Sequence, residues 1–262
     1  MTRLEPEKEH PLRVPSLEPL SGLQHRGVSS PRGDESQFEV RIASSPRDLH
    51  AIGHLRYRVY VEEMGKVYPT ADHERELLLD EFDLVSTNLL VERRGSKGEP
   101  PEVIAAVRET LADAGSSDLH DAMGCPAALL QAIPASRLSC TTRLVVSRPY
   151  RAHADVLPPL LLAIYCVGAA RGDWVNWIHA RLRLSPMFER LGFRRFGDPF
   201  WCGPSQSRHQ GFVLLMDDLE NFLRLKSPYV HACQAHFVNG PRIEPARALG
   251  SVQGHLQAGG GV

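Results

Sequence analysis

Hydrophobic and polar positions alternate from residue 38 to residue 42, which predicts a β-strand with one buried face. Ser45, Pro46 and Asp48 follow and mark the start of a helix. Ser45 suits the N-cap, Pro46 fits the first helical position, and Asp48 is favoured near the positive helix end. Apolar residues between 49 and 60 then predict a broad hydrophobic face on this helix.

The next part of the chain predicts an antiparallel hairpin and a fourth strand. Residues 69–83 are mostly polar and predict a loop. Two apolar runs, 88–92 and 103–108, are separated by a turn region containing Gly, Lys and Pro, which is typical of a hairpin. Residues 112–134 predict a loop with a short helix, and the β-branched residues of 139–146 favour a strand.

The second half begins with a long apolar helix at residues 154–171, which Gly172 ends. A short amphipathic helix at 184–191 ends in the same way at Gly192. The other elements predicted here are strands at 174–179, 193–196 and 212–216 and a short helix at 219–225. The order β-α-β-β-β-α-β-α-β-β favours an α/β (α+β) fold, with a mixed, mainly antiparallel sheet and helices on both faces.

One large domain is expected at residues 37–226. Residues 1–36 contain Pro, Ser, Arg and Glu with little apolar content, so we expect a disordered segment that is neither a secretory signal nor a membrane anchor. Residues 227–262 form a C-terminal extension, expected to be loose from about residue 240. The most apolar run, 156–170, is shorter than the roughly 20 residues that span a bilayer, so we expect no integral membrane segment.

Composition narrows the classes of function. The formal net charge is −1, which gives no general attraction to nucleic acid. The five cysteines contain no C-x-x-C pair, and we interpret them as reduced thiols of a cytoplasmic protein. The spacing of His231, Cys233 and His236 matches no standard zinc pattern, so we expect no metal and no permanently bound cofactor.

Two motifs in the second half resemble a known family. Arg143-Leu-Val-Val-Ser-Arg-Pro-Tyr-Arg151 and the apolar helix after it resemble the fourth strand, pantetheine loop and third helix of GNAT acyltransferases. Met187-Phe-Glu-Arg-Leu-Gly-Phe193 is similar to a second signature of that family. The resemblance covers roughly residues 140–196 and implies a GNAT-like N-acyltransferase fold.

The front half resembles a narrower branch, the acyl-homoserine-lactone (autoinducer) synthases and the long-chain N-acyl amino acid synthases. The segment 55–61 is similar to their "R-x-x-V-F" helix, Asp80-x-x-Asp83 to their paired aspartates, and Arg108 and Arg143 to their strand arginines. This resemblance implies transfer of a medium or long acyl group from an acyl thioester to the amine of an amino acid or related molecule. The thioester would be carried by acyl carrier protein or by CoA.

Several residues depart from these families. Cys140 stands where lactone synthases tend to carry a glutamate, and residues 64–68 lack their tryptophan, which weakens homoserine-lactone synthesis. Residues 151–156 lack the glycines of the acetyl-CoA loop, and Phe188 replaces a tyrosine often used as a general acid, which weakens acetyl transfer. A CoA-dependent acetyltransferase and a non-catalytic module that binds acyl carriers both stay open as alternatives.

Aminolysis of a thioester needs a base for the amine, donors for the oxyanion and a surface that holds the carrier. Each candidate residue also has a structural interpretation, as an ion pair, a strand-end or core residue, or surface charge. The candidates are Asp80, Asp83, Glu109 and Arg143 for catalysis, Arg56, Arg108 and His179 for substrate binding, and Val145, Val146, Arg148 and Arg151 for the acyl-carrier pantetheine.

Overall fold

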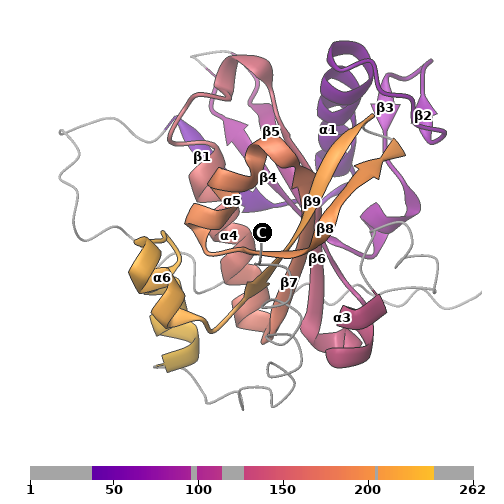
Figure 1. Ribbon diagram of the computed structural model, residues 1–262. Helices are drawn as coiled ribbons and strands as arrows, with labels where there is room; N and C mark the ends of the chain where they lie inside the picture. Colours follow the sequence, from indigo (N-terminus) through magenta and orange to yellow (C-terminus); the bar gives the residue numbers. More distant parts are fainter. Residues whose placement is uncertain (1–36, 96–98, 114–126, 204–205, 239–262) are drawn as a thin grey trace, which may run out of the picture. The chain divides into compact units, whose positions relative to one another are not determined.

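The computed structural model describes residues 37–95, 99–113, 127–203 and 206–238 (Figure 1). The segments expected to be disordered, 1–36 and from about 240 onward, lie outside these residues. No helix in the described part of the chain has the length and apolar character needed to cross a membrane. The helices and longer strands are β1 Phe38–Ile42, α1 Pro46–Arg56, β4 Thr87–Arg93, β5 Glu102–Leu111, α3 Ala127–Ala132, β6 Leu138–Val146, α4 Leu157–Arg171, β7 Val175–Arg181, α5 Ser185–Leu191, β8 Arg194–Cys202, β9 Ser207–Leu215, α6 Leu219–Leu225 and α7 Val230–Cys233.

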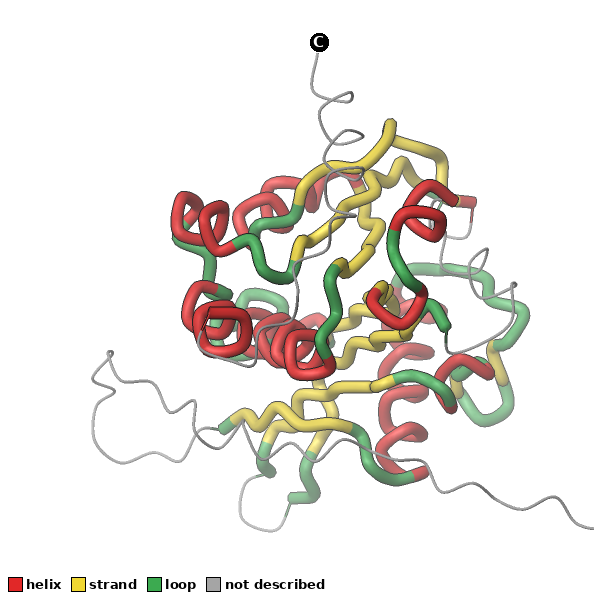
Figure 2. Tube along the Cα trace, turned by 90° about the horizontal axis from the view of Figure 1, so that it is seen from below, coloured by secondary structure: helices red, strands yellow, loops and turns green. Residues whose placement is uncertain are grey.

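Seven strands form one sheet in the order β1-β4-β5-β6-β7-β9-β8. All neighbouring strands are antiparallel except β6 and β7, which run parallel. Helix α1 packs on one face, and α4 and α5 lie on the other (Figures 1 and 2). The prediction of a mixed, mainly antiparallel sheet between helices is therefore confirmed.

Helix α1 forms where the sequence predicts it, because its start is encoded locally. The Ser45 hydroxyl accepts a hydrogen bond from the Asp48 backbone N–H at 3.2 Å, and the Asp48 carboxylate accepts one from the Ser45 N–H at 3.1 Å. Ile52 and Leu55 of this helix pack on Val145 and other apolar residues of the sheet. The helix continues in π-helical geometry through Tyr57–Glu63.

Helix α4 covers the opposite face of the sheet with a largely apolar surface. It ends at Gly172, whose φ of +85° is the left-handed conformation that glycine adopts without strain. Its first residue is Leu157 rather than 154, because Pro158 and Pro159 occupy the first turn. The Tyr165 ring stacks on Tyr229 with 4.5 Å between centroids, so residues after 226 also pack on this face.

Two predictions about extended segments were wrong. Residues 69–83, predicted as a loop, contain a small hairpin of β2 Ala71–Asp72 and β3 Leu77–Leu78. Strands β8 and β9 are longer than predicted, because they pair with each other well beyond the apolar residues that mark their buried parts. The pairing reaches Cys202 opposite Ser207.

Candidate functional site

The parallel strands β6 and β7 separate and leave an opening in the sheet. They pair only from Leu138 opposite Val175 to Cys140 opposite Trp177. Beyond these residues a cavity of about 250 Å³ occupies the gap between the two strands. Strand β6 contributes Thr141 to Leu144 to its lining, and β7 contributes Ile178 to Arg181.

A β-bulge in β6 shapes one wall of this cavity. Ala106 pairs with Val145 and Arg108 with Thr142, so Arg143 and Leu144 together oppose a single residue of β5. Arg143 has a φ of +56°, a backbone conformation that residues other than glycine rarely adopt. The Tyr60 hydroxyl donates a hydrogen bond to the Leu144 carbonyl at 2.7 Å. This bond from the helix side holds the bulge and the direction of Arg143.

A buried ion-pair network lies beside the bulge. The Asp83 carboxylate accepts from Arg56 at 2.7 Å, and the Asp80 carboxylate accepts from Arg143 at 2.7 Å and also from Arg108. The side chains are at most 9% exposed, except Arg143 at 19%. Burial alone would raise the pKa of Asp80, but the charges of Arg108 and Arg143 lower it. The ion pairs expected between these arginines and aspartates are therefore present.

Of these network residues, Arg143 lines the cavity, and Arg56, Arg108, Asp80 and Asp83 do not. Asp80 caps the start of the 3-10 helix Glu81–Leu84, which contains Asp83, and the Asp80 N–H donates to the Asp83 carboxylate at 3.0 Å. The two carboxylates hold the arginines in place, and Arg143 is the member that they present to the cavity.

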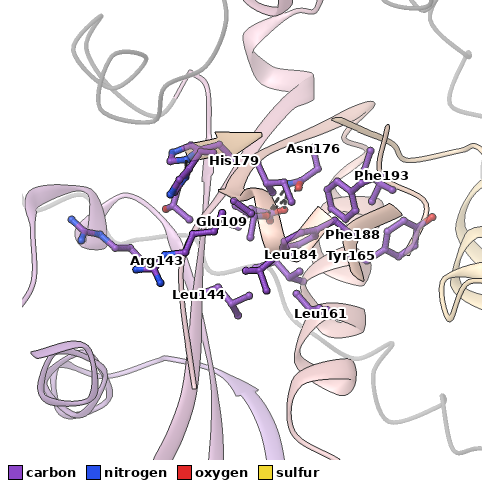
Figure 3. Close-up of a pocket in the computed structure, with 18 of the residues that line it drawn as sticks. Glu109, Arg143, Leu144, Leu161, Tyr165, Asn176, His179, Leu184, Phe188 and Phe193 are labelled. Atoms are coloured by element: carbon purple, nitrogen blue, oxygen red, sulfur yellow. Dashed lines mark hydrogen bonds between the residues drawn. The ribbon is translucent and has the colours of Figure 1, made fainter. Parts of the chain in front are cut away.

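Glu109 lies inside the cavity as a fully buried carboxyl group (Figure 3). It accepts hydrogen bonds from Arg171 at 2.8 Å and from the Asn176 amide at 3.4 Å. Burial raises the pKa of Glu109 to about 7, with Asp173 adding to the rise and Arg171 opposing it. Glu109 can therefore gain or lose a proton near neutral pH.

His179 and His209 form a second titratable pair, on the side of the cavity that Arg143 shares. Their Nδ1 atoms are 2.9 Å apart in a hydrogen bond. Burial, and then the charge of Lys66, lowers the pKa of His179, and burial lowers that of His209 to about 4. Both imidazoles are neutral at pH 7. Sequence patterns missed His209, since its part of β9 has no buried apolar run.

Cys202 completes a group that offers metal ligands. Its Sγ and one nitrogen each of His179 and His209 lie within 4.8 Å of one another, a donor set that zinc accepts. In the described residues no other such group occurs. The charges of Lys66 and Arg181 act on this group and oppose the binding of a cation.

The opposite end of the cavity is apolar. Leu161 of α4, Phe188 of α5 and Phe193 line it together with Tyr165 and Leu214. Figure 3 shows these aromatic side chains on one side, His179 and Arg143 on the other, and Glu109 between them. The cavity therefore joins a polar, cationic end to a hydrophobic end through the gap in the sheet.

The residues predicted to hold pantetheine lie outside the cavity lining. Val145 packs in the core against α1. Arg151 donates to the Val146 carbonyl at 3.0 Å and to Glu63 at 2.9 Å, which ties the loop after β6 to the end of the π-helical segment Tyr57–Glu63. Arg148 is exposed.

The comparisons agree with this architecture. The family model described as an acetyltransferase (GNAT) domain matches residues 55–157. The lactone synthase LasI superposes with a TM-score of 0.55 at 16% identity, over 80% of this chain and 99% of LasI. The chain has the GNAT fold. FeeM, an N-acyl amino acid synthase from uncultured soil microbes, superposes with a TM-score of 0.54 at 12% identity, over 74% and 97% of the two chains.

A sequence relative extends this likeness. An L-ornithine N(alpha)-acyltransferase of Rhodobacter capsulatus is 38% identical over 72 residues. That alignment spans 27% of this chain and 28% of the relative's length. The expected resemblance to GNAT proteins, and within them to N-acyl amino acid and lactone synthases, is confirmed.

Proposed function

We propose that this GNAT domain is an N-acyltransferase that moves a medium or long fatty-acyl group from an acyl thioester to the amine of an amino acid or related small molecule. The observation that carries the proposal is the cavity between β6 and β7. A hydrophobic end suits an acyl chain, and a polar end with neutral imidazoles suits an amine. The ornithine N(alpha)-acyltransferase and N-acyl amino acid synthase likenesses support the same reaction class.

The reaction needs no covalent intermediate on the protein. The amine attacks the thioester carbonyl, the C–N bond forms, the C–S bond breaks, and the thiolate leaves with the proton that the amine releases. Glu109 and His179 are the predicted bases that line the cavity. His179 suits this role because it is neutral, and in the tautomer in which its Nδ1 donates to His209 the lone pair of Nε2 is available to take the proton.

Arg143 is assigned the role of stabilising negative charge on the carbonyl oxygen. Its side chain lines the cavity beside the bulge, and Asp80 fixes its direction at 2.7 Å. Asp80, Asp83, Arg56 and Arg108 then act as positioning residues behind Arg143 rather than at the substrate. This assignment follows from their burial and from their mutual ion pairs.

The start of α4 favours acyl carrier protein over CoA as donor. Free backbone N–H groups at a helix N-terminus bind phosphate, but Pro158 and Pro159 remove two of them here. A CoA thioester presents a pyrophosphate to this region, whereas a carrier-protein thioester presents one phosphate. Arg148, which is exposed, adds positive charge that suits an acidic carrier surface, whereas the charge of Arg151 is balanced by Glu63.

Expression in a bacterial host tests the proposal, because the host supplies acyl carriers and amino acids. Mass spectrometry of lipid extracts is expected to show new N-acyl amino acids that a strain expressing Arg143→Ala lacks. Arg75→Ala, at an exposed site outside the cavity lining, is the matched control and is expected to keep the products. A lipid profile unchanged by well-folded protein would overturn the proposal.

A further inference from the structure

Two cations at the polar end of the cavity have no carboxylate partner within the described residues. They are Lys66 and Arg181, which both line the cavity and are partly buried. Lys66 follows the π-helical segment Tyr57–Glu63, and Arg181 is the last residue of β7. Arg143 pairs with Asp80 and Arg171 pairs with Glu109, while Arg183, which also lines the cavity, is exposed to solvent. Lys66 and Arg181 therefore differ from their neighbours in what balances their charge.

The surroundings of Lys66 concentrate positive charge. Its Nζ lies 4.8 Å from the centre of the Tyr60 ring, an arrangement that stabilises a cation without neutralising it. Burial lowers the pKa of Lys66, and the charges of Arg181 and Arg143 lower it further, against an opposing effect of Cys202. Buried cations are normally paired, so this cluster favours an anion that enters from outside the chain.

We propose that Lys66 and Arg181 bind the carboxylate of the acceptor, so that this domain acylates amino acids and rejects amines that lack a carboxylate. The inference rests on the proposed function and names the substrate feature that the same site recognises. A carboxylate has two oxygens for two cationic donors. In an amino acid it lies one carbon from the amine, so binding it holds the amine beside His179.

The cations also help the chemistry of the bound amine. An ammonium group held near Lys66 and Arg181 loses its proton more readily, because like charges disfavour the charged form. The amine is then a free nucleophile at neutral pH, and the neutral His179 can take its proton. The same positive charge explains why an anion suits this end better than a metal ion on His179, Cys202 and His209.

The test compares each amino acid with the amine left after removal of its carboxylate, for example L-ornithine with 1,4-diaminobutane and L-leucine with 3-methylbutylamine. Purified full-length protein is assayed with a defined acyl donor, and product is measured by mass spectrometry. We expect wild type to prefer the amino acids by about a hundredfold in kcat/KM. Lys66→Met and Arg181→Gln are each expected to raise the acceptor KM about ten- to hundredfold, with the donor KM unchanged.

Arg208→Gln is the matched control, because Arg208 is exposed on β9 and does not line the cavity. It is expected to leave both KM values unchanged. A rise of the donor KM in Lys66→Met or Arg181→Gln would instead assign these cations to a donor phosphate and overturn the inference. Equal rates with amino acids and with their decarboxylated amines would overturn it too, while leaving acyl transfer itself intact.

If no acyl transfer is seen, the proposed function is refuted, but a binding measurement still tests the carboxylate site. N-dodecanoyl-leucine and its methyl ester are titrated into the protein by calorimetry. Binding of the acid but not the ester, with loss of that binding in Lys66→Met, would support a carboxylate site. Equal binding of acid and ester would overturn it.

Discussion

The buried pair of Arg56 and Asp83 gives the sharpest prediction for the stability of this domain. The Asp83→Asn variant keeps the size and shape of the side chain and removes its charge. Arg56 then stays inside the protein with a side chain that is 1% exposed and with no ionised partner at 2.7 Å. Arg108 lies 3.3 Å from the same carboxylate, so it also loses one of the negative charges that balance its own charge.

The expected loss is about 3 to 5 kcal/mol in the free energy of unfolding, because breaking a buried pair leaves an uncompensated charge. With a urea m-value of about 3 kcal/mol/M, this loss lowers the unfolding midpoint by roughly 1 to 1.7 M without changing m. Adding Arg56→Met to Asp83→Asn removes the unpaired buried cation and is expected to recover part of the lost free energy of unfolding.

The measurement is equilibrium urea unfolding, followed by tryptophan fluorescence and by far-ultraviolet circular dichroism. Glu189→Gln is the control, because its pair with Arg195 is exposed by 39% and 55% and is expected to contribute less than about 1 kcal/mol. A loss below 1 kcal/mol for Asp83→Asn, equal to that of the control, would refute the view that the negative charge of Asp83 stabilises the buried Arg56.

Three further predictions concern the cavity and the sheet around it. Glu109 has a raised pKa of about 7, so its contribution to stability is full below its unfolded pKa and is lost as pH rises through about 7; unfolding of Glu109→Gln followed from pH 4 to pH 8 is expected to show a weaker decline than wild type. Tyr60→Phe leaves the Leu144 carbonyl without its donor at 2.7 Å and is expected to cost about 1 to 3 kcal/mol in urea unfolding and to lower acyl transfer; wild-type stability and turnover would contradict a role in the bulge. Gly211→Ala places a methyl group 2.2 Å from the Trp177 ring and is expected to destabilise by about 1 to 3 kcal/mol, seen as a lower melting temperature; an unchanged value would mean that the ring moves freely.

Local signals in the sequence were enough to place most elements. The Ser45 cap and the left-handed Gly172 are set by residues within one turn, and the structure has both of them. The hairpin of β4 and β5 was also predictable, since two apolar runs are joined by a short turn region.

Features that depend on distant contacts could not be predicted. The residues around Arg143 read as an uninterrupted strand, and the bulge becomes evident only through the register with β5 and the hydrogen bond from Tyr60. His209 joins the site through the pairing of β9 with β7, and Lys66 joins it from the loop that follows the π-helical segment Tyr57–Glu63. The motif residues Asp80 and Asp83 lie outside the cavity lining and pair with Arg143, Arg108 and Arg56.

Reconstitution with purified components tests the central claim most directly. Full-length protein is mixed with a dodecanoyl carrier-protein thioester, dodecanoyl-CoA or acetyl-CoA in separate reactions, each with the twenty standard amino acids and L-ornithine, and the products are identified by mass spectrometry. The account predicts an N-dodecanoyl amino acid, formed fastest from the carrier-protein thioester and absent with Arg143→Ala. Acetylated products alone, or no product from any donor with folded protein, would contradict it.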